Sequence, residues 1–192
     1  MTTRIITAPQ TVAFWRYMHR NYSTEVRDKT APEMQVIGAV LAAMGIMDRE
    51  KFTRDFSITL GHAIYPNFTV GDAGKVALAA QVAICVHEHV HVRQFHRTDF
   101  VWDYCLDSSR RTLHECEGYR ASMEMAYWFT GRCPTVASLV TKLGAYNLTA
   151  DDLAFAGTYL TKARAVVVKG GIITPEAQVA IRWLAPRLAE EG

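Results

Sequence analysis

A long, almost uninterrupted apolar stretch ends in a cluster of histidines, and this junction constrains the possible folds more than any other feature. Between Val76 and Val86 nearly every residue is apolar, and only Gln81 breaks the hydrophobic pattern in its middle. A helix that is apolar on all sides has to be buried among other elements. The sequence His87-Glu88-His89-Val90-His91 follows directly. Ionisable side chains at the end of a buried helix are costly unless partners satisfy them, so we expect a specific polar site inside the fold.

The composition is that of an ordinary globular protein. The 192 residues are 49% hydrophobic and 21% charged, which is enough apolar material for one domain with its own core. We therefore expect residues 1–192 to form a single domain. The formal net charge is only +2, which gives no electrostatic reason to expect nucleic acid or an anionic membrane as a partner.

Neither the N-terminal residues nor the cysteines indicate export. Residues 1–10 contain one arginine and no sustained apolar region, so they do not resemble a signal peptide. The longest apolar run, 76–86, is too short to span a bilayer. The four cysteines include no Cys-x-x-Cys pair, and Cys85 and Cys116 lie in apolar helical patterns where buried, reduced thiols are expected. We expect a cytoplasmic protein.

Capping and helix-breaking residues predict a mostly helical chain with one small β region. Alternating β-branched residues within 56–68 predict one or two short strands, and Pro66 favours a sheet edge. The fold class is therefore α+β, with a small sheet preceding the histidine helix. Helices are predicted from Thr7–Pro9 through Met18, from Pro32 to about Met47, from Ala73 (capped by Asp72) to about His96, from Asp107–Ser109 to about Phe129, from Pro134 to Leu143, from Thr149 to Lys169, and from Thr174–Pro175 onward.

The spacing of two histidines within the motif favours a metal site. His87 and His91 are four residues apart, which on a helix is about 40° of rotation, so both imidazoles can bind one zinc ion. Glu88 lies on the same side and can reach a metal-bound water without being a ligand. The alternative is a histidine-rich helix end that favours the helix dipole. His89 lies about 160° from His91 and is predicted to be a core residue.

The third ligand is expected from the acidic residues of the next long helix. Glu115, Glu117 and Glu124 are the candidates. Gly118 costs about 1 kcal/mol in a helix interior, so it needs a packing reason, and a close crossing over the His87 helix would supply one. Glu115 lies about 60° from Gly118 and Glu117 about 100°. We therefore favour Glu115 as the ligand and keep Glu117 as the alternative. Gln94 lies one turn after His91 on the same helix face. It is either a partner in the metal site or a surface residue.

These residues resemble the gluzincin class of zinc metallopeptidases. His87-Glu88-His89-Val90-His91, followed after 24 residues by Glu115 and then by Gly118, is similar to a motif in which one helix supplies two histidines and the next supplies a glutamate. The resemblance covers about residues 56–130 and includes a strand at 58–65 like the one beside the cleft in that class. It implies a zincin-like domain, a Zn²⁺ cofactor and a peptide or protein substrate. Many gluzincins carry an Asp where this chain has Tyr119.

The resulting hypothesis is a zinc metallopeptidase. His87, His91 and Glu115 would hold zinc, and Glu88 would act as general base on the attacking water. The peptide would lie extended against the strand at 58–65. Two alternatives are a non-catalytic structural or assembly protein that retains the zinc site, and a metal-free helical binding module. Candidate residues for stabilising an oxyanion are Tyr65, His62, Tyr104, Tyr119 and Arg120.

Overall fold

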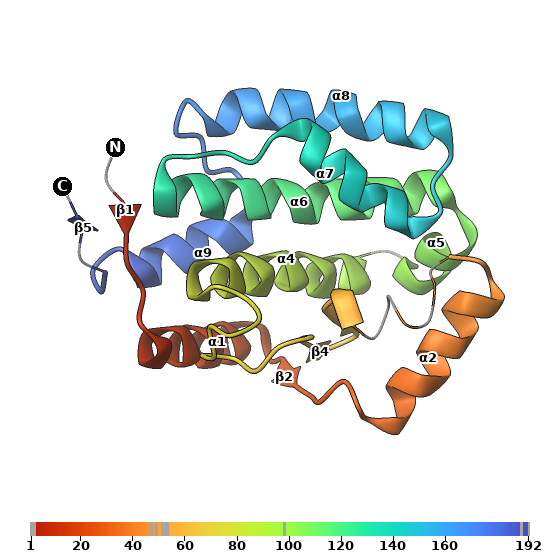
Figure 1. The fold of residues 1–192 in the computed structure, drawn as a ribbon, viewed down its shortest axis with the longest axis horizontal. Helices are drawn as coiled ribbons and strands as arrows, with labels where there is room; N and C mark the ends of the chain where they lie inside the picture. The colour runs from red at the N-terminus through yellow and green to blue at the C-terminus, as the bar shows by residue number, and fades with distance from the viewer. Residues whose placement is uncertain are drawn as a thin grey trace.

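The structure is a computed structural model that describes residues 3–46, 48, 50, 54–97, 99–188 and 190–191. It is mostly helical with a small three-stranded sheet, which confirms the predicted α+β class (Figure 1). The helices are α1 (Ala8–Tyr22), α2 (Pro32–Ala43), α4 (Leu78–Arg97), α5 (Phe100–Leu106), α6 (Ser108–Thr130), α7 (Val136–Leu143), the 3₁₀ helix η1 (Gly144–Tyr146), α8 (Ala150–Val167) and α9 (Pro175–Leu184). The strands are β1 (Thr3–Arg4), β2 (Glu25–Val26), β3 (Ile58–Leu60), β4 (Ala63–Tyr65) and β5 (Glu190–Glu191).

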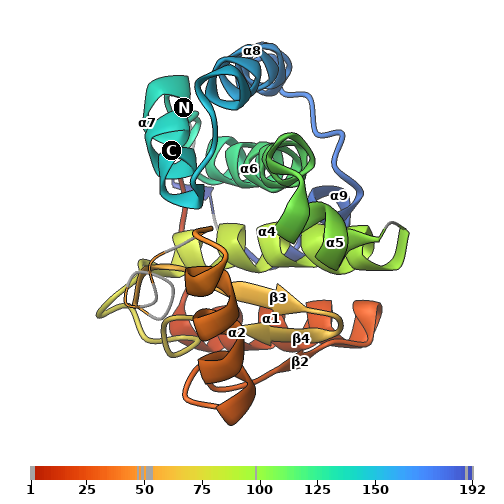
Figure 2. The same cartoon turned by 90° about the vertical axis from the view of Figure 1, so that its right-hand side faces the viewer.

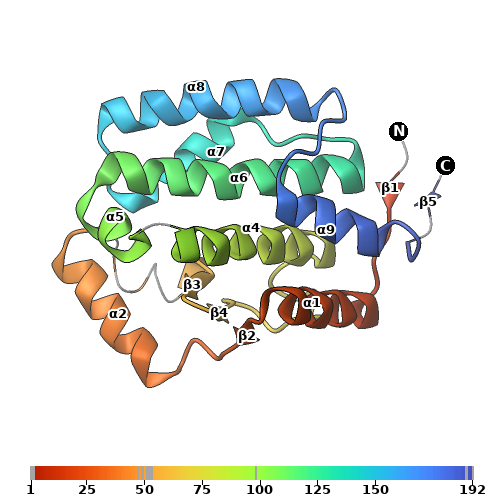
Figure 3. The same cartoon turned by 180° about the vertical axis from the view of Figure 1, so that it is seen from behind.

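Helices α4 and α6 lie side by side at the centre of the molecule. Helices α7 and α8 cover α6 on one side, α1 and the three-stranded sheet cover α4 on the other, and α9 packs against both α4 and α6 (Figures 1 and 3). One face of α6 contributes Met125 and Phe129 to the core around α1, α4 and α9, and another contributes Cys116 and Met123 to the core around α7 and α8. Within the described ranges, no helix is long and apolar enough to cross a membrane.

Side-chain caps begin the helices close to the predicted positions. Thr7 forms a capping box with Gln10 at the start of α1, and Thr149 forms one with Asp152 at the start of α8. The Asp107 carboxylate accepts hydrogen bonds from the first free amides of α6. These bonds satisfy donors that the helix itself leaves unpaired, which is why the sequence located these ends well.

The predicted start of the histidine helix was wrong by about one turn. Helix α4 begins at Leu78 rather than Ala73. The Asp72 carboxylate instead accepts a hydrogen bond from the Gly74 amide at 2.9 Å, within a turn. The Gln81 side-chain amide donates to the carbonyls of Asp72 and Val76, so a buried residue of the helix holds the preceding segment as a loop. Short elements such as α5 and β2 were not predicted.

The small sheet has the order β2-β4-β3. Strand β4 is buried and pairs parallel with β2 and antiparallel with β3, where Thr59 is opposite Ile64. Pro66 therefore follows the central strand rather than marking an edge, and it removes no hydrogen bond from the ladder because it lies just beyond Tyr65. The edge strand beside α4 is β3.

Gly71, in the turn before α4, gives a test of how that turn packs against α1. Gly71 has a φ of +88°, and a β-carbon there would lie 2.7 Å from Val12 Cγ2 of α1. Gly71→Ala should therefore lower the free energy of unfolding by about 1–3 kcal/mol, measured by urea denaturation. Gly144→Ala is the matched control, because a β-carbon there meets nothing within 4 Å and the φ of −58° suits alanine. Equal effects of the two substitutions would contradict the assigned packing.

Candidate metal centre

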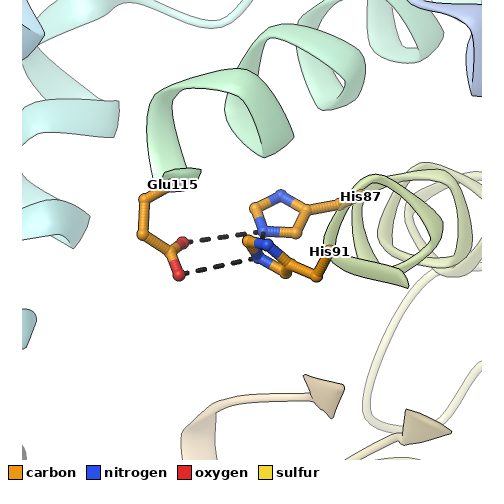
Figure 4. Close-up of side chains that lie close together, drawn as sticks. All are labelled: His87, His91 and Glu115. Atoms are coloured by element: carbon orange, nitrogen blue, oxygen red, sulfur yellow. Dashed lines mark hydrogen bonds and ion pairs between the residues drawn. The ribbon is translucent and has the colours of Figure 1, made fainter. Parts of the chain in front are cut away.

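Three side chains predicted as ligands meet between α4 and α6 (Figure 4). The Nε2 atoms of His87 and His91 lie 3.0 Å apart. Glu115 Oε2 lies 3.6 Å from His87 Nε2, and Glu115 Oε1 lies 3.6 Å from His91 Nε2. All three side chains are buried. The arrangement thus brings together two imidazole nitrogens and one carboxylate from two helices that are separate in sequence.

The spacing of these atoms fits a divalent metal ion. Bonds of about 2.0–2.1 Å in a tetrahedral site place neighbouring ligand atoms roughly 3.3 Å apart, and the observed separations of 3.0 and 3.6 Å lie on either side of that value. Glu115 Oε2 is buried and has no hydrogen-bond partner among the described residues. A buried carboxylate oxygen without a hydrogen bond is costly, and a cation next to it would remove that cost.

Hydrogen bonds behind the imidazoles orient them. Gln94 uses its amide nitrogen to donate to the His114 carbonyl and to Glu117 Oε2, so its oxygen accepts from His91 Nδ1, at 2.8 Å. His91 therefore carries its proton on Nδ1 and presents the Nε2 lone pair to the centre. The hydroxyl of Ser122 lies 3.3 Å from Nδ1 of His87 and can accept its proton in the same way.

Glu115 is held from α5. The hydroxyl of Tyr104 donates a hydrogen bond of 2.8 Å to Glu115 Oε1. Burial alone would raise the pKa of Glu115, but the neighbouring His91 and His87 imidazoles and the Tyr104 hydroxyl lower it to about 2. The carboxylate is thus ionised at neutral pH, as a metal ligand has to be.

The other two acids of α6 face elsewhere. Glu117 binds Gln94 and lies 3.6 Å from Arg93, so it supports His91 from behind rather than joining the ligand atoms. Glu124 is buried against the start of α9 and accepts hydrogen bonds from the amides of Ile173 and Thr174. Neither belongs to the group of ligand atoms that lie within 4.8 Å of one another.

Gly118 marks the place where the two helices meet, as its position in the sequence predicted. A β-carbon on Gly118 would lie 2.7 Å from both Cε1 and Nε2 of His87. The His87 ring therefore occupies the space that any larger residue would fill. The ring of Tyr119, which stands where many gluzincins carry Asp, packs edge-on against His87 with centroids 5.2 Å apart. Here the polar partner of His87 is Ser122 instead.

Glu88 lies beside the three candidate ligands without joining them. It is buried, and the Thr59 hydroxyl of β3 donates a 2.8 Å hydrogen bond to its Oε2. Burial raises the pKa of Glu88, although nearby His91 and the bond from Thr59 act in the opposite direction. Glu88 and Glu115 both line one cavity of about 230 Å³, so a small molecule in that cavity would meet both carboxylates.

The structure separates several other candidates from this centre. Tyr65 donates to Glu33, the exposed His62 ring packs at a tilt against the ring of His96, and the Arg120 guanidinium lies next to Thr174 and Glu124. His89 is a core residue, as predicted: it bonds to the Cys85 carbonyl and Thr24 hydroxyl, and burial lowers its pKa to about 4.

Sequence reasoning missed four contributors, which are Thr59, Ser122, Tyr146 and the apolar face of α2. Ser122 lies seven residues after Glu115 and hence on the same helix face, a signal that was available. Tyr146 and α2 line the cavity but lie outside the expected core of residues 56–130. The site is therefore larger than the segment on which the gluzincin resemblance rests.

The close approach at Gly118 predicts a selective loss of metal affinity. Gly118→Ala should push the His87 ring out of place and weaken zinc binding about 10- to 100-fold, the size of effect seen when ligand orientation is lost. Gly157→Ala is the control within α8, since a β-carbon there meets only Val140 Cγ2, at 4.0 Å. Competition with a chelating dye measures both affinities, and circular dichroism checks the fold. Unchanged affinity in Gly118→Ala would contradict the role of His87.

The two neighbouring acids give a second test. The parent protein should hold about one zinc ion per chain by elemental analysis. Glu115→Ala removes a ligand and should weaken zinc binding by more than about 100-fold, because direct ligands contribute more than the residues that orient them. Glu117→Ala removes one of the two acceptors of Gln94 and a neighbour of Arg93, and should cost about tenfold or less. The opposite order would make Glu117 the ligand.

Comparison with known proteins adds no relative to these observations. No family model, no curated protein and no solved structure matches the chain. The functional interpretation therefore depends on the residues of the centre and on their geometry, namely two imidazoles and a carboxylate that converge, and a fourth buried group, Glu88, next to them.

Proposed function

We propose that this protein is a zinc-dependent hydrolase, a metallopeptidase whose site resembles that of the gluzincins. The observation that carries the proposal is a second buried carboxylate, Glu88, in the same cavity as the three candidate ligands. A purely structural ion gains nothing from such a group. Structural zinc sites are also usually closed by four protein ligands, whereas the described residues bring three together.

The candidate ligands differ in what they contribute. His87 and His91 present nitrogen lone pairs, and Glu115 brings one negative charge, a ligand set that suits Zn²⁺. A zinc ion held there would supply Lewis acidity and a water molecule of lowered pKa. Tyr104 donates a hydrogen bond to Glu115, and Gln94 accepts one from His91. These bonds keep the two candidate ligands from rotating away.

Glu88 is the proposed general base. Its carboxylate accepts a proton from the attacking water and returns that proton to the nitrogen of the leaving amine, so the protein ends the cycle in its starting state. Thr59 fixes the position of this carboxylate by its hydrogen bond to Oε2. A base that is held by packing and by a hydrogen bond needs less reorganisation during the reaction.

Strand β3 supplies a place for an extended substrate. It is the edge strand next to α4 in the three-stranded sheet, and all three of its residues line the cavity. A peptide that adds to a sheet edge gains main-chain hydrogen bonds. Because Thr59 of this strand also binds Glu88, a peptide paired with β3 would lie close to the proposed base. We therefore propose a peptide or protein substrate.

The proposed compartment is the cytoplasm. All four cysteines, Cys85, Cys105, Cys116 and Cys133, are free thiols in the structure. Burial raises the pKa of Cys85 and Cys116, which keeps them protonated and unreactive. Reduced thiols of this kind are typical of reducing compartments.

Glu88→Gln separates catalysis from metal binding. The amide keeps the shape of the side chain but cannot take up a proton, so hydrolysis of a fluorescence-quenched peptide library should fall by about 10²- to 10⁴-fold, while elemental analysis should still find about one zinc ion per chain.

Three results would count against this assignment. Loss of zinc from Glu88→Gln would make Glu88 a ligand. Equal activity of the parent and the variant, purified identically, would show that Glu88 is not the general base. A parent protein that holds zinc and cleaves nothing in the library would favour the structural or assembly role instead.

A further inference from the structure

The charged side chains of the cavity at the candidate centre lie on one side, while Ser57, Thr59, Tyr104 and Tyr146 add uncharged polar groups to its other walls. His87, Glu88, His91 and Glu115 line it from α4 and α6. The remaining walls come from α2, the segment 56–60 that contains β3, α5 and η1, and they are mostly apolar. The apolar lining residues are Val36, Ile37, Val40, Leu41, Ile46, Phe56, Ile58, Leu60, Phe100 and Val101. A molecule in contact with the polar groups would therefore be enclosed by hydrocarbon.

The rim of the cavity is apolar as well. Four lining residues are large hydrophobics that also reach solvent, and they come from three different elements. Their exposed fractions are 64% for Val36 and 48% for Val40 in α2, 38% for Leu60 in β3, and 44% for Val101 in α5. These elements gather at the end of the molecule that faces the viewer in Figure 2. Exposed apolar side chains that converge on a cavity are typical of ligand sites, whereas scattered ones need no explanation.

The side chains of the cavity offer no cation to an anionic group that lies away from the candidate metal ligands. Among the described residues that line it, none is Lys or Arg, and the only carboxylates are Glu88 and Glu115. A substrate carboxylate or phosphate there would lose water and gain no cationic side chain. A cationic group would compete for carboxylates already bonded to Thr59 and Tyr104. An uncharged group loses little in entering.

We propose that this cavity binds a large, uncharged apolar side chain of the substrate, aromatic or branched aliphatic, next to the bond that is cleaved. The inference rests on the proposed hydrolase function for the position of that bond. Helix α2 determines the selectivity, because it supplies four of the apolar lining residues. The volume of about 230 Å³ is several times the roughly 30 Å³ of one water molecule, so it suits a leucine or phenylalanine side chain better than alanine.

Binding of short neutral peptides tests the proposal without requiring turnover. The probes are N-acetyl-glycyl-X-amides with X as Phe, Leu, Ala, Asp or Lys, titrated by calorimetry into the full-length protein, both metal-free and zinc-loaded. The Phe and Leu probes should bind at least tenfold more tightly than the Asp and Lys probes. Equal affinities across the series would overturn the proposal.

A charge on α2 should reverse the preference. Val40→Lys places an ammonium group at the rim, so the affinity for the Phe probe should fall at least tenfold and that for the Asp probe should rise. Val166→Lys is the matched control, because Val166 is 40% exposed on α8 and does not line the cavity. Leu60→Lys repeats the test from β3 should Val40→Lys fail to fold. Lysine variants at the rim that behave like Val166→Lys would contradict the assignment.

The two proposals fail in different ways. An apolar preference in a protein that neither holds zinc nor hydrolyses peptides would keep the binding site and reject the hydrolase. Hydrolysis that depends on Glu88, with kcat/KM values no higher for Phe and Leu substrates than for Asp and Lys substrates, would keep the hydrolase and reject the apolar site.

Discussion

The contact between His87 of α4 and Gly118 of α6 sets the geometry on which the candidate centre depends. Only glycine at position 118 lets the His87 ring lie this close to α6, because a β-carbon on that residue would be 2.7 Å from the ring. Because the helices are this close, Glu115, one turn before Gly118, reaches the Nε2 atoms of both histidines. A larger residue at position 118 would move the ring and separate the ligand atoms, even if each ligand kept its identity.

The polar end of α4 is tolerated in the core because α6, β3 and the segment that follows α1 supply partners for it. Its buried polar side chains are His87, Glu88, His89, His91 and Gln94. Unpartnered, each would cost roughly 1–3 kcal/mol. Ser122, Thr59, Thr24 and Glu117 lie within hydrogen-bond distance of four of them, and Gln94 itself accepts from His91. The bonds that make the helix compatible with burial are therefore the same bonds that orient the site, so folding and site geometry are coupled.

The sequence predicted the parts of this arrangement that depend on spacing within one helix. The separation of His87 and His91 follows from helical periodicity, and Gly118 indicated which face of the second helix would approach. Contacts between elements could not be predicted in this way. Thr59 meets Glu88 only because β3 packs beside α4. Residues of α2 and η1 line the cavity through chain reversals that leave no periodic signal.

The misplaced start of α4 has the same origin. Asp72 is a good local cap, and local reasoning placed the helix there, but Gln81 binds the carbonyls of Asp72 and Val76 and holds the segment as a loop. A contact formed by the folded helix outweighed the local preference of the residues before it. Propensity is thus a reliable guide at α1 and α8, where the cap bonds lie within the helix end itself.

The apolar walls of the cavity strengthen the interactions between its charged groups. Apolar walls exclude water, and a low local dielectric strengthens every interaction between the charged groups that remain. Glu88 and Glu115 both lie close to His91 in space, yet their pKa values move in opposite directions. Glu115 gains more from the two imidazoles and Tyr104 than it loses by burial, whereas Glu88 does not. In the proposed hydrolase, the carboxylate with the lowered pKa would remain ionised and the one with the raised pKa would exchange a proton. In the proposed hydrolase, the apolar residues of α2 and α5 would therefore affect the chemistry of the centre as well as its selectivity.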